Sequence, residues 1–192
     1  MMNKERCPWC LGHSVYIDYH DNEWGVPVVD DQKQFEFLVL ESAQAGLSWL
    51  TILKRREGYR KQYENFDVEQ VARFDESKIE RMLNDPGIIR NRKKIESSIN
   101  NAKCFLQIQE SHGSFSNYLW NFVDGHPIIN RFASLGETPA RTPLSDTISK
   151  EMKKRGFQFL GSTIIYAHLQ ATGLVNDHLI SCFRYHECMV QS

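Results

Sequence analysis

The spacing of apolar residues is the feature that most limits the fold of this chain. Apolar side chains recur at intervals of three and four residues through most of the sequence, which is typical of amphipathic helices. In the segment 32–45, for example, Phe35 and Leu38 lie on one face of such a helix. Alternating β-branched runs joined by Asn-Gly or Asp-Gly turns are scarce. The sequence therefore predicts an all-α fold.

Capping residues and helix breakers divide this pattern into separate helices. Asp30 and Asp31 can cap the helix over 32–45, and Ser48 precedes a second helix that Gly58 should weaken. The Gly- and Pro-containing segment 124–143 is expected to be a loop. Three further helices are expected to begin at Asp67, at Asp75 and at Asn91, the last of them running through Leu106. Others should span 115–123 and 162–172, and one should run from a Ser145 cap to Gly156. A last turn or short helix should begin at 176–178.

Length and composition favour a single globular unit over residues 1–192. Hydrophobic residues make up 41% of the chain and charged residues 24%, which is ordinary for a soluble protein. No stretch approaches the roughly 20 apolar residues that a membrane span needs, and residues 1–6 lack an apolar signal core. We therefore expect a cytoplasmic protein without membrane contact. Nothing in the sequence suggests an obligate partner, so a monomer is expected.

The overall charge does not indicate a nucleic-acid partner. Lysine and arginine total 23 against 24 acidic residues, and the formal net charge is −1. Any DNA-binding surface must therefore be local. The densest basic runs are 90–94, 54–56 and 153–155, although such runs are usually solvated helix faces.

Four of the five cysteines lie near the two ends of the chain, beside His13, His20, His178 and His186. There are five cysteines, an odd number, and with no export signal disulfides are not expected. His178 and Cys182 are four residues apart, so on a helix they would share one face and supply half of a tetrahedral metal site. Cys7 and His20 would most simply supply the other half. Such a site would tie the two chain ends together.

Spacing alone leaves other ligand sets open. Cys7 and Cys10 form a Cys-x-x-Cys pair, and other donors lie close by in the sequence. These are His13, His186 and Cys188. The alternative is that the thiols are simply buried and the histidines lie on the surface. The sequence assigns no role to Cys104.

A tight turn between two helices near 75–106 is a candidate DNA contact. Pro86-Gly87 breaks the chain between the two helical patterns. Backbone N–H groups in such a turn can face a phosphate at the amino terminus of the second helix. Many helical hairpins have turns of this kind, so the pattern by itself is weakly specific. The candidate contacts are the amides of Gly87 and Ile89 and the charges of Arg90, Arg92 and Lys93.

Glu41 stands on an otherwise apolar helix face, just before a Gly-containing loop and Trp49. Carboxylates are seldom buried without a partner or a task, which makes Glu41 a candidate site residue. Aromatic residues are also dense in the first quarter of the chain: Trp9, Tyr16, Tyr19 and Trp24. The alternative is an aromatic core in which a neighbouring backbone group satisfies Glu41.

Four motifs together resemble the bacterial DNA-3-methyladenine glycosylase I family. They are Tyr16-Ile17-Asp18-Tyr19-His20-Asp21-Asn22-Glu23-Trp24-Gly25-Val26-Pro27, Gln44-Ala45-Gly46-Leu47-Ser48-Trp49, Gly87-Ile88-Ile89-Arg90 and Gly173-Leu174-Val175-Asn176-Asp177-His178. They occur in the order and spacing of the family, from about Arg6 to Cys182. Chance similarity in four separate motifs is improbable.

The resemblance implies a helix-hairpin-helix glycosylase fold with a structural zinc ion that joins the amino- and carboxyl-terminal segments. It selects Cys7, His20, His178 and Cys182 as the ligands. It also implies release of 3-methyladenine from double-stranded alkylated DNA after the nucleotide is flipped out. Finally, it implies a base pocket made by Glu41, Tyr19 and Trp49, lined by Trp9 and Tyr16, and a Gly46-Leu47 turn that presses into the duplex.

We expect hydrolysis of the glycosidic bond without strand cleavage, because no lysine stands out as a Schiff-base nucleophile. No catalytic aspartate can be assigned by motif, so Glu41 is the leading catalytic or recognition residue. A non-catalytic helix-hairpin-helix DNA-binding module is the first rival, but it leaves the pocket residues without a purpose. A zinc hydrolase is the second, and four protein ligands disfavour it because catalytic zinc usually keeps an open position.

Overall fold

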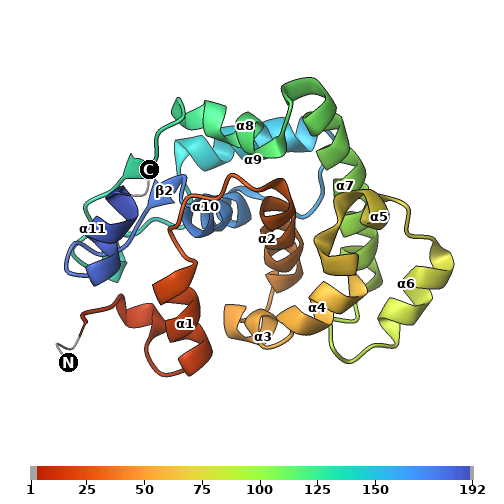
Figure 1. The fold of residues 1–192 in the computed structure, drawn as a ribbon, viewed down its shortest axis with the longest axis horizontal. Coiled ribbons are helices and arrows are strands. Elements are labelled where there is room, and N and C mark those ends of the chain that lie inside the picture. The colour runs from red at the N-terminus through yellow and green to blue at the C-terminus, as the bar shows by residue number, and fades with distance from the viewer. Residues whose placement is uncertain (1–3, 191–192) are drawn as a thin grey trace.

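The structure is a computed structural model that describes residues 4–190. It is mostly helical (Figure 1), as the sequence predicted. The α-helices are α1 (Ser14–Asn22), α2 (Asp31–Gln44), α3 (Trp49–Leu53), α4 (Arg56–Gln62), α5 (Val68–Ala72), α6 (Glu76–Leu83), α7 (Arg92–His112), α8 (Phe115–Trp120), α9 (Pro143–Lys154), α10 (Ser162–Ala171) and α11 (Phe183–Val190). Short 3-10 helices are η1 (Pro8–Cys10), η2 (Glu64–Phe66), η3 (Asn121–Val123) and η4 (Leu135–Glu137), and the strands are β1 (Ile128–Ile129) and β2 (Val175–Asn176).

Helix α2 runs through the middle of the molecule (Figure 1). Every residue from Gln34 to Ala43 is buried, because α3, α7, α8 and α10 pack around it. The main hydrophobic core includes Phe35 from α2, with Phe105 from α7 and Phe115 from α8 stacked at 4.2 Å between ring centroids. Glu41 therefore belongs to a helix that is packed into the main hydrophobic core.

Most predicted helix starts are confirmed. The side chains of Asp30, Asp67, Asp75 and Asn91 each accept a hydrogen bond from the backbone N–H three residues later. Asp31 caps a different helix from the one expected. Its carboxylate accepts from the N–H groups of residues 115 and 116, at 2.8 Å each, and so caps α8.

Three boundaries differ from the sequence-based expectation. The helix after Ser48 is interrupted at residues 54–55, which separate α3 from α4, and α7 continues to His112. Helix α9 begins at Pro143 rather than at Ser145, because Thr142 is the true cap. The side chains of Thr142 and Ser145 each accept from the backbone N–H of the other, which forms a capping box.

The segment that holds His178 and Cys182 is not a helix, so the predicted helical spacing of these two residues is wrong. Helix α11 begins only at Phe183. The N–H of Leu179 donates to Cys7 Sγ at 3.4 Å, and the N–H of Ile180 donates to the carbonyl of Phe132 at 3.0 Å. These bonds tie the segment to distant parts of the chain, and the N–H of Cys182 closes a turn on the carbonyl of Leu179 at 2.8 Å.

A two-residue pair of parallel strands lies within the region expected to be all helix and loop. Ile128 pairs with Val175 and Ile129 with Asn176. The N–H of Ile128 donates to Leu174 at 2.9 Å, and that of Asn130 donates to Asn176 at 3.1 Å. Strands this short leave no periodic signal, which explains why the sequence did not predict them. The pair fixes the position of the chain just before residue 177.

Helices α6 and α7 pack against each other and are joined by a short turn, which will be called the hairpin, and α4 packs against this turn. A Cβ atom on Gly58 would lie 2.2 Å from the carbonyl oxygen of Gly87. Gly58 therefore allows two backbones to approach closely, which outweighs its weak helix propensity.

The two terminal segments lie on the same side of the molecule (Figure 1). The N–H of Phe183 donates to the carbonyl of Glu5 at 3.0 Å, and Cys7, Leu179 and Cys182 form a small buried cluster. Within residues 4–190 no helix has the length and apolar character required to cross a membrane.

Candidate active site and metal cluster

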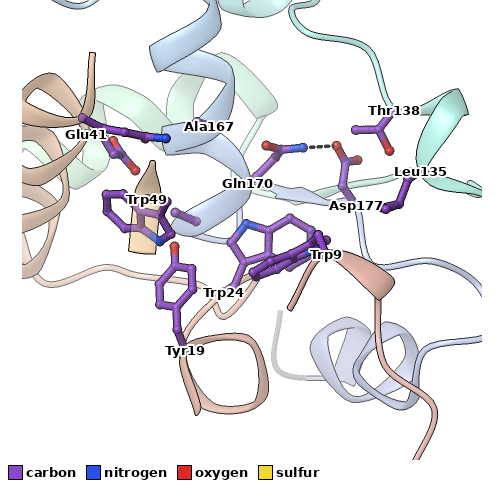
Figure 2. Close-up of a pocket in the computed structure, with 12 residues that line it drawn as sticks. Trp9, Tyr19, Trp24, Glu41, Trp49, Leu135, Thr138, Ala167, Gln170 and Asp177 are labelled. Atoms are coloured by element: carbon purple, nitrogen blue, oxygen red, sulfur yellow. Dashed lines mark hydrogen bonds between the residues drawn. The ribbon is translucent and has the colours of Figure 1, made fainter. Parts of the chain in front are cut away.

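A cavity of about 260 Å³ opens between α2, α10 and the terminal segments (Figure 2). Its volume lies just below the range of drug-sized ligand pockets, which suits one flat heterocycle. Most of the lining is apolar or aromatic, with a few polar groups. It consists of Trp9, Tyr19, Trp24, Glu41, Gln44, Trp49, Leu135, Thr138, Ala167, Gln170, Ala171 and Asp177.

Glu41 is buried in the last turns of α2 and lines the cavity. Its Oε2 lies 2.8 Å from Nδ1 of His168 on α10. Within the described residues Oε1 has no hydrogen-bond partner, so it remains available to a ligand. Burial raises the pKa of Glu41 above its ordinary value, and His168 opposes part of that shift. The protonation state of the Glu41 carboxyl group therefore depends on the charge of the groups that it contacts.

Aromatic rings make the opposite side of the cavity. The ring centroid of Trp9 lies 5.1 Å from Trp24 and 6.3 Å from Tyr19, and Tyr19 lies 5.6 Å from Trp49. Burial and the neighbouring Glu41 raise the pKa of Tyr19, so its hydroxyl stays protonated and can donate. The indole Nε1 of Trp49 is buried and faces the hydroxyl of Tyr19 (Figure 2). The wall thus offers π-faces and hydrogen-bond donors to a planar ligand.

Tyr16 is not among the residues that line the cavity. Its hydroxyl accepts from the N–H of Leu50 at 2.9 Å, and its ring packs edge-on against Trp9 at 5.8 Å. Tyr16 therefore supports the wall from behind and holds the start of α3, which carries Trp49. Direct contact of Tyr16 with a base stays a prediction.

The sequence reasoning missed several lining residues. Gln44 lies three residues after Glu41 on the same helix face, so helical spacing could have found it. Asp177 could not be found in this way. Its carboxylate accepts from Tyr166, from Gln170 at 2.7 Å and from Asn130 at 2.7 Å, and these donors come from α10 and from the residue after β1. Figure 2 shows the bond between Gln170 and Asp177 at the far end of the cavity from Glu41.

The loop after α2 carries the predicted Gly46-Leu47 turn. Gly46 has φ of +81°, a conformation that glycine adopts readily, and the Leu47 side chain is 40% exposed. Lys94 Nζ donates to the carbonyls of Ala43 and Ala45, at 2.7 Å each, and so ties the loop to α7. The structure presents an apolar side chain at the surface beside the cavity.

The two hairpin amides proposed to contact phosphate both have acceptors within the chain. The N–H of Gly87 donates to Asp85 Oδ1 at 2.7 Å, and that of Ile89 donates to the hydroxyl of Tyr59 at 3.2 Å. A phosphate contact through these amides needs those bonds to rearrange. It stays a prediction.

The three basic side chains of the hairpin differ in their surroundings. Arg92 forms ion pairs with three carboxylates, those of Glu76, Glu80 and Glu96. Arg90 and Lys93 are exposed and have no acidic partner within the described residues. Of these three charges, those of Arg90 and Lys93 are therefore the ones not paired with a carboxylate within the described residues.

Four donors from both ends of the chain converge at one buried point. Their ligand atoms all lie within 4.8 Å of one another, and the group could hold a metal ion. The four are the predicted Cys7, His20, His178 and Cys182. Cys182 Sγ lies 3.4 Å from His20 Nε2 and 3.6 Å from His178 Nδ1, and Cys7 Sγ lies 3.7 Å from His178 Nδ1.

Outer hydrogen bonds set the orientation of both imidazoles. His20 Nδ1 lies 2.8 Å from Asp21, which Arg6 holds in turn by paired hydrogen bonds. His178 Nε2 lies 3.0 Å from the carbonyl oxygen of Trp24 and donates to it. Each ring therefore turns its other nitrogen toward the cluster, which is how metal-binding histidines are usually oriented.

The remaining donors lie outside this cluster. Cys10 Sγ donates to the carbonyl of Cys7 at 3.1 Å, and the ring of His13 caps α1 by accepting from Val15. Cys104 is buried in α7, and Cys188 is buried in α11. The structure thus groups one of the ligand sets that spacing had left open.

Comparisons with known proteins agree with this geometry. Residues 9–185 match the family model described as methyladenine glycosylase. DNA-3-methyladenine glycosylase 1 of Escherichia coli (strain K12) is 48% identical over 181 residues, which cover 94% of this chain and 97% of that relative.

Two solved structures are similar over nearly the whole chain. A crystal structure of 3-methyladenine DNA glycosylase I shares 50% identity at a TM-score of 0.90, and the match covers 93% of this chain and 98% of that one. A tyrosine-to-phenylalanine variant of 3-methyladenine DNA glycosylase I in complex with 3-methyladenine shares 37% identity at a TM-score of 0.90, covering 93% and 96%.

Proposed function

The chain belongs to the methyladenine glycosylase family and excises 3-methyladenine from DNA, and we propose that it does so by holding the flipped base against Glu41, Tyr19 and Trp49. The single observation that carries this assignment is the buried Glu41 carboxyl in an aromatic-lined cavity of about 260 Å³. A module that only binds DNA needs no such cavity.

Charge is the basis of selection. A 3-methylated adenine in DNA carries a formal positive charge that unmodified adenine lacks. A cation over the face of Trp49 gains about 1–2 kcal/mol in a desolvated site. Glu41 Oε1 accepts hydrogen bonds from the adenine edge and favours the same charge. Damaged bases also stack poorly, which lowers the cost of extrusion from the duplex.

The chemical step needs little proton transfer, because the cationic base is already a good leaving group. The glycosidic bond breaks as positive charge develops on the sugar, and the base leaves with the electron pair. Positioning and electrostatic stabilisation therefore supply most of the catalysis. The residues lining the described cavity include no lysine that could form a Schiff base, so water completes the reaction without strand cleavage.

The surface beside the cavity is suited to double-stranded DNA. Leu47 fills the gap that the extruded nucleotide leaves, and Gly46 allows the turn to approach the duplex. The hairpin contacts phosphates through Arg90 and Lys93, with further contributions from Gly87, Ile89 and Arg92. Trp9 lines the base pocket and Tyr16 supports it.

Cys7, His20, His178 and Cys182 would hold one zinc ion per chain, and its role would be structural. A tetrahedral shell with Zn–S of about 2.3 Å and Zn–N of about 2.0–2.1 Å places sulfur and nitrogen about 3.6 Å apart. The observed separations of 3.4–3.7 Å support that geometry. Four protein ligands leave no open position for a catalytic water. Bound by these four residues, the ion would hold the terminal segments against the cavity.

We place the activity in a single unit over residues 1–192, acting as a monomer on chromosomal DNA in the bacterial cytoplasm. The Escherichia coli relative, which matches over nearly the whole chain, supports this proposal.

The deciding experiment incubates the purified protein with methylated double-stranded DNA and analyses the released bases. We expect free 3-methyladenine and intact strands. No release above background would overturn the proposed reaction. Fewer than one zinc per folded chain would overturn the proposed metal.

A further inference from the structure

His168 is a buried imidazole behind the cavity that the reaction described above does not use. It lies in α10, is 0% exposed, and contacts Glu41 through Nδ1 at 2.8 Å. Its other nitrogen, Nε2, lies 2.8 Å from Oε1 of Gln34, which is also 0% exposed. Gln34, His168 and Glu41 thus form a hydrogen-bonded chain that ends at the cavity.

The amide of Gln34 can adopt only one orientation. Its other terminal atom lies 2.8 Å from the carbonyl oxygen of Val28. A carbonyl oxygen only accepts, and this one also accepts from Trp120 Nε1 at 3.1 Å. If the amide were flipped, two oxygens would face each other at 2.8 Å. Gln34 therefore donates to Val28 through Nε2 and turns its Oε1 toward His168.

This orientation fixes a proton on His168. Because Gln34 Oε1 can only accept, His168 Nε2 must carry a hydrogen. The 2.8 Å contact between His168 Nδ1 and Glu41 Oε2 must then contain the one further proton that makes it a hydrogen bond. Without that proton, the lone pair of Nδ1 would face the lone pairs of an ionised carboxylate.

We propose that His168 is a positioning residue which, anchored by Gln34, keeps one proton in its hydrogen bond to Glu41 and so holds Glu41 Oε1 toward the base. The inference rests on the proposed role of Glu41 in base recognition. With the proton present, Glu41 and His168 together are neutral, which lets a carboxyl group stay buried. When the proton leaves, Oε2 loses its donor and Glu41 no longer keeps its orientation.

Few other titratable groups face this pair. The elements packed most closely against α10 are α2, α9 and β2. Glu41 is the titratable group that α2 presents to His168. Helix α9 buries only Ser145, Ile148 and Met152, and its charged side chains lie outside that buried set.

The cavity itself adds two further groups. Asp177, just after β2, lines its far end, and Tyr19 of α1 lines its near wall. Asp177 is tied to neutral donors, and the pKa of Tyr19 is raised well above its ordinary value by burial. A loss of activity as the pH rises is therefore assigned to the proton in the 2.8 Å contact between Glu41 and His168.

The test compares the single-turnover rate of 3-methyladenine release between pH 6 and pH 9, at saturating enzyme, in the wild type and in His168→Asn. In the wild type we expect the rate to fall about tenfold per pH unit above the titration of the pair. Asparagine offers a neutral N–H donor that does not titrate. We expect His168→Asn to be slower by about tenfold and to lack the alkaline decline.

His168→Leu gives a second comparison, because leucine leaves Glu41 buried without a donor. We expect a loss on the order of 100-fold. His126→Asn is the matched control, since His126 is exposed, and it should keep the wild-type profile. An unchanged alkaline decline in His168→Asn would overturn the inference while leaving the proposed function standing. Absence of release by the wild type would overturn the proposed function instead.

Nitrogen-15 NMR of the wild-type protein provides a measurement that does not depend on a variant folding. We expect His168 Nε2 to be protonated across the pH range and Nδ1 to lose its shared proton at the pH of the alkaline decline. An unprotonated Nε2 at neutral pH would contradict the inferred chain.

Discussion

The two walls of the cavity are held in different ways. The wall that carries Glu41 belongs to α2 and α10, and both helices lie in the main hydrophobic core. The wall that carries Trp9 and Trp24 belongs to the amino-terminal segment, which packs in two small clusters of buried residues. The carboxyl group therefore rests on the core, whereas the aromatic surface depends on local ties.

Three ties hold the aromatic wall. One is the Cys/His cluster that joins both chain ends. A second is the ion pair of Glu23, just after α1, with Arg56 of α4 at 2.6 Å. The third is the hydrogen bond from the N–H of Gly25, just after Trp24, to the carbonyl of Gln170 on α10 at 3.1 Å. This difference indicates that a variant can displace the aromatic stacking surface without displacing the carboxyl group, and the reverse. Five variants test that independence.

Loss of a metal ligand should have the largest effect, because binding of a structural ion contributes directly to folding. We expect Cys182→Ala to lose the bound metal, to lower the free energy of unfolding by about 5 kcal/mol and to abolish base release. Hydrogen exchange should show lost protection in residues 4–25 and 174–190, while α2 and α7 remain protected.

Cys10→Ala is the control for that variant, because Cys10 is buried nearby but lies outside the cluster. It should retain the metal and the exchange pattern. Equal loss of protection in α2 and in the terminal segments would show that the two walls are not independent.

Glu41→Gln should lower the single-turnover rate of release on the order of 100-fold, because a neutral amide cannot stabilise the cationic base as a carboxylate does. The melting temperature should change little, because the core around α2 is unaltered. Glu110→Gln, at an exposed position of α7, is the matched control. A wild-type rate for Glu41→Gln would remove Glu41 from the reaction.

Glu23→Gln should weaken the aromatic wall in a pH-dependent way. Burial alone would raise the pKa of Glu23, but Arg56 and Lys33 lower it to about 2 from an ordinary 4.5. A carboxyl group with a lowered pKa stabilises the fold above pH 4.5, and this contribution is lost as the pH falls toward 2.

We therefore expect Glu23→Gln to lower the free energy of unfolding by about 2 kcal/mol at pH 7, measured by urea denaturation. The difference from the wild type should shrink at pH 3. Glu57→Gln removes a carboxyl that is 81% exposed and should change little. A Glu23→Gln deficit that does not depend on pH would refute the ion-pair explanation.

Trp49→Ala should lower the rate of 3-methyladenine release about tenfold, the loss of roughly 1–2 kcal/mol of cation–π stabilisation. Trp49→Phe retains a ring face and should lie between Trp49→Ala and the wild type. The comparison uses single-turnover release with saturating enzyme. If both variants release the base at the wild-type rate, stacking on Trp49 does not contribute.

The smallest expected effect concerns the hairpin. Arg90→Gln should reduce the slope of log affinity against log salt concentration by about 0.9, the value for one phosphate contact. Arg92→Gln should change the slope less, because three carboxylates already surround Arg92. Fluorescence anisotropy with duplex DNA measures both. The reverse order would show that Arg92 leaves its ion pairs on binding.

Much of the site was accessible from local sequence patterns. Glu41 was a polar exception on an apolar helix face, and Trp49 followed it closely in the sequence. The ligand set came from four donors near the chain ends together with the family resemblance. The supposed helix through His178 and Cys182 was wrong, yet the pairing survived, because a turn held by Cys7 and Phe132 also brings the two side chains together.

The sequence by itself determined the helices, their caps, the buried carboxyl group and the donors for a metal, since these depend on residues a few positions apart. Only the tertiary structure decided what Glu41 faces. His168 is 127 residues from Glu41 and 134 from Gln34, and no local period links them. Their hydrogen bonds exist because α2 and α10 pack together. Protonation at the cavity is therefore a property of that packing.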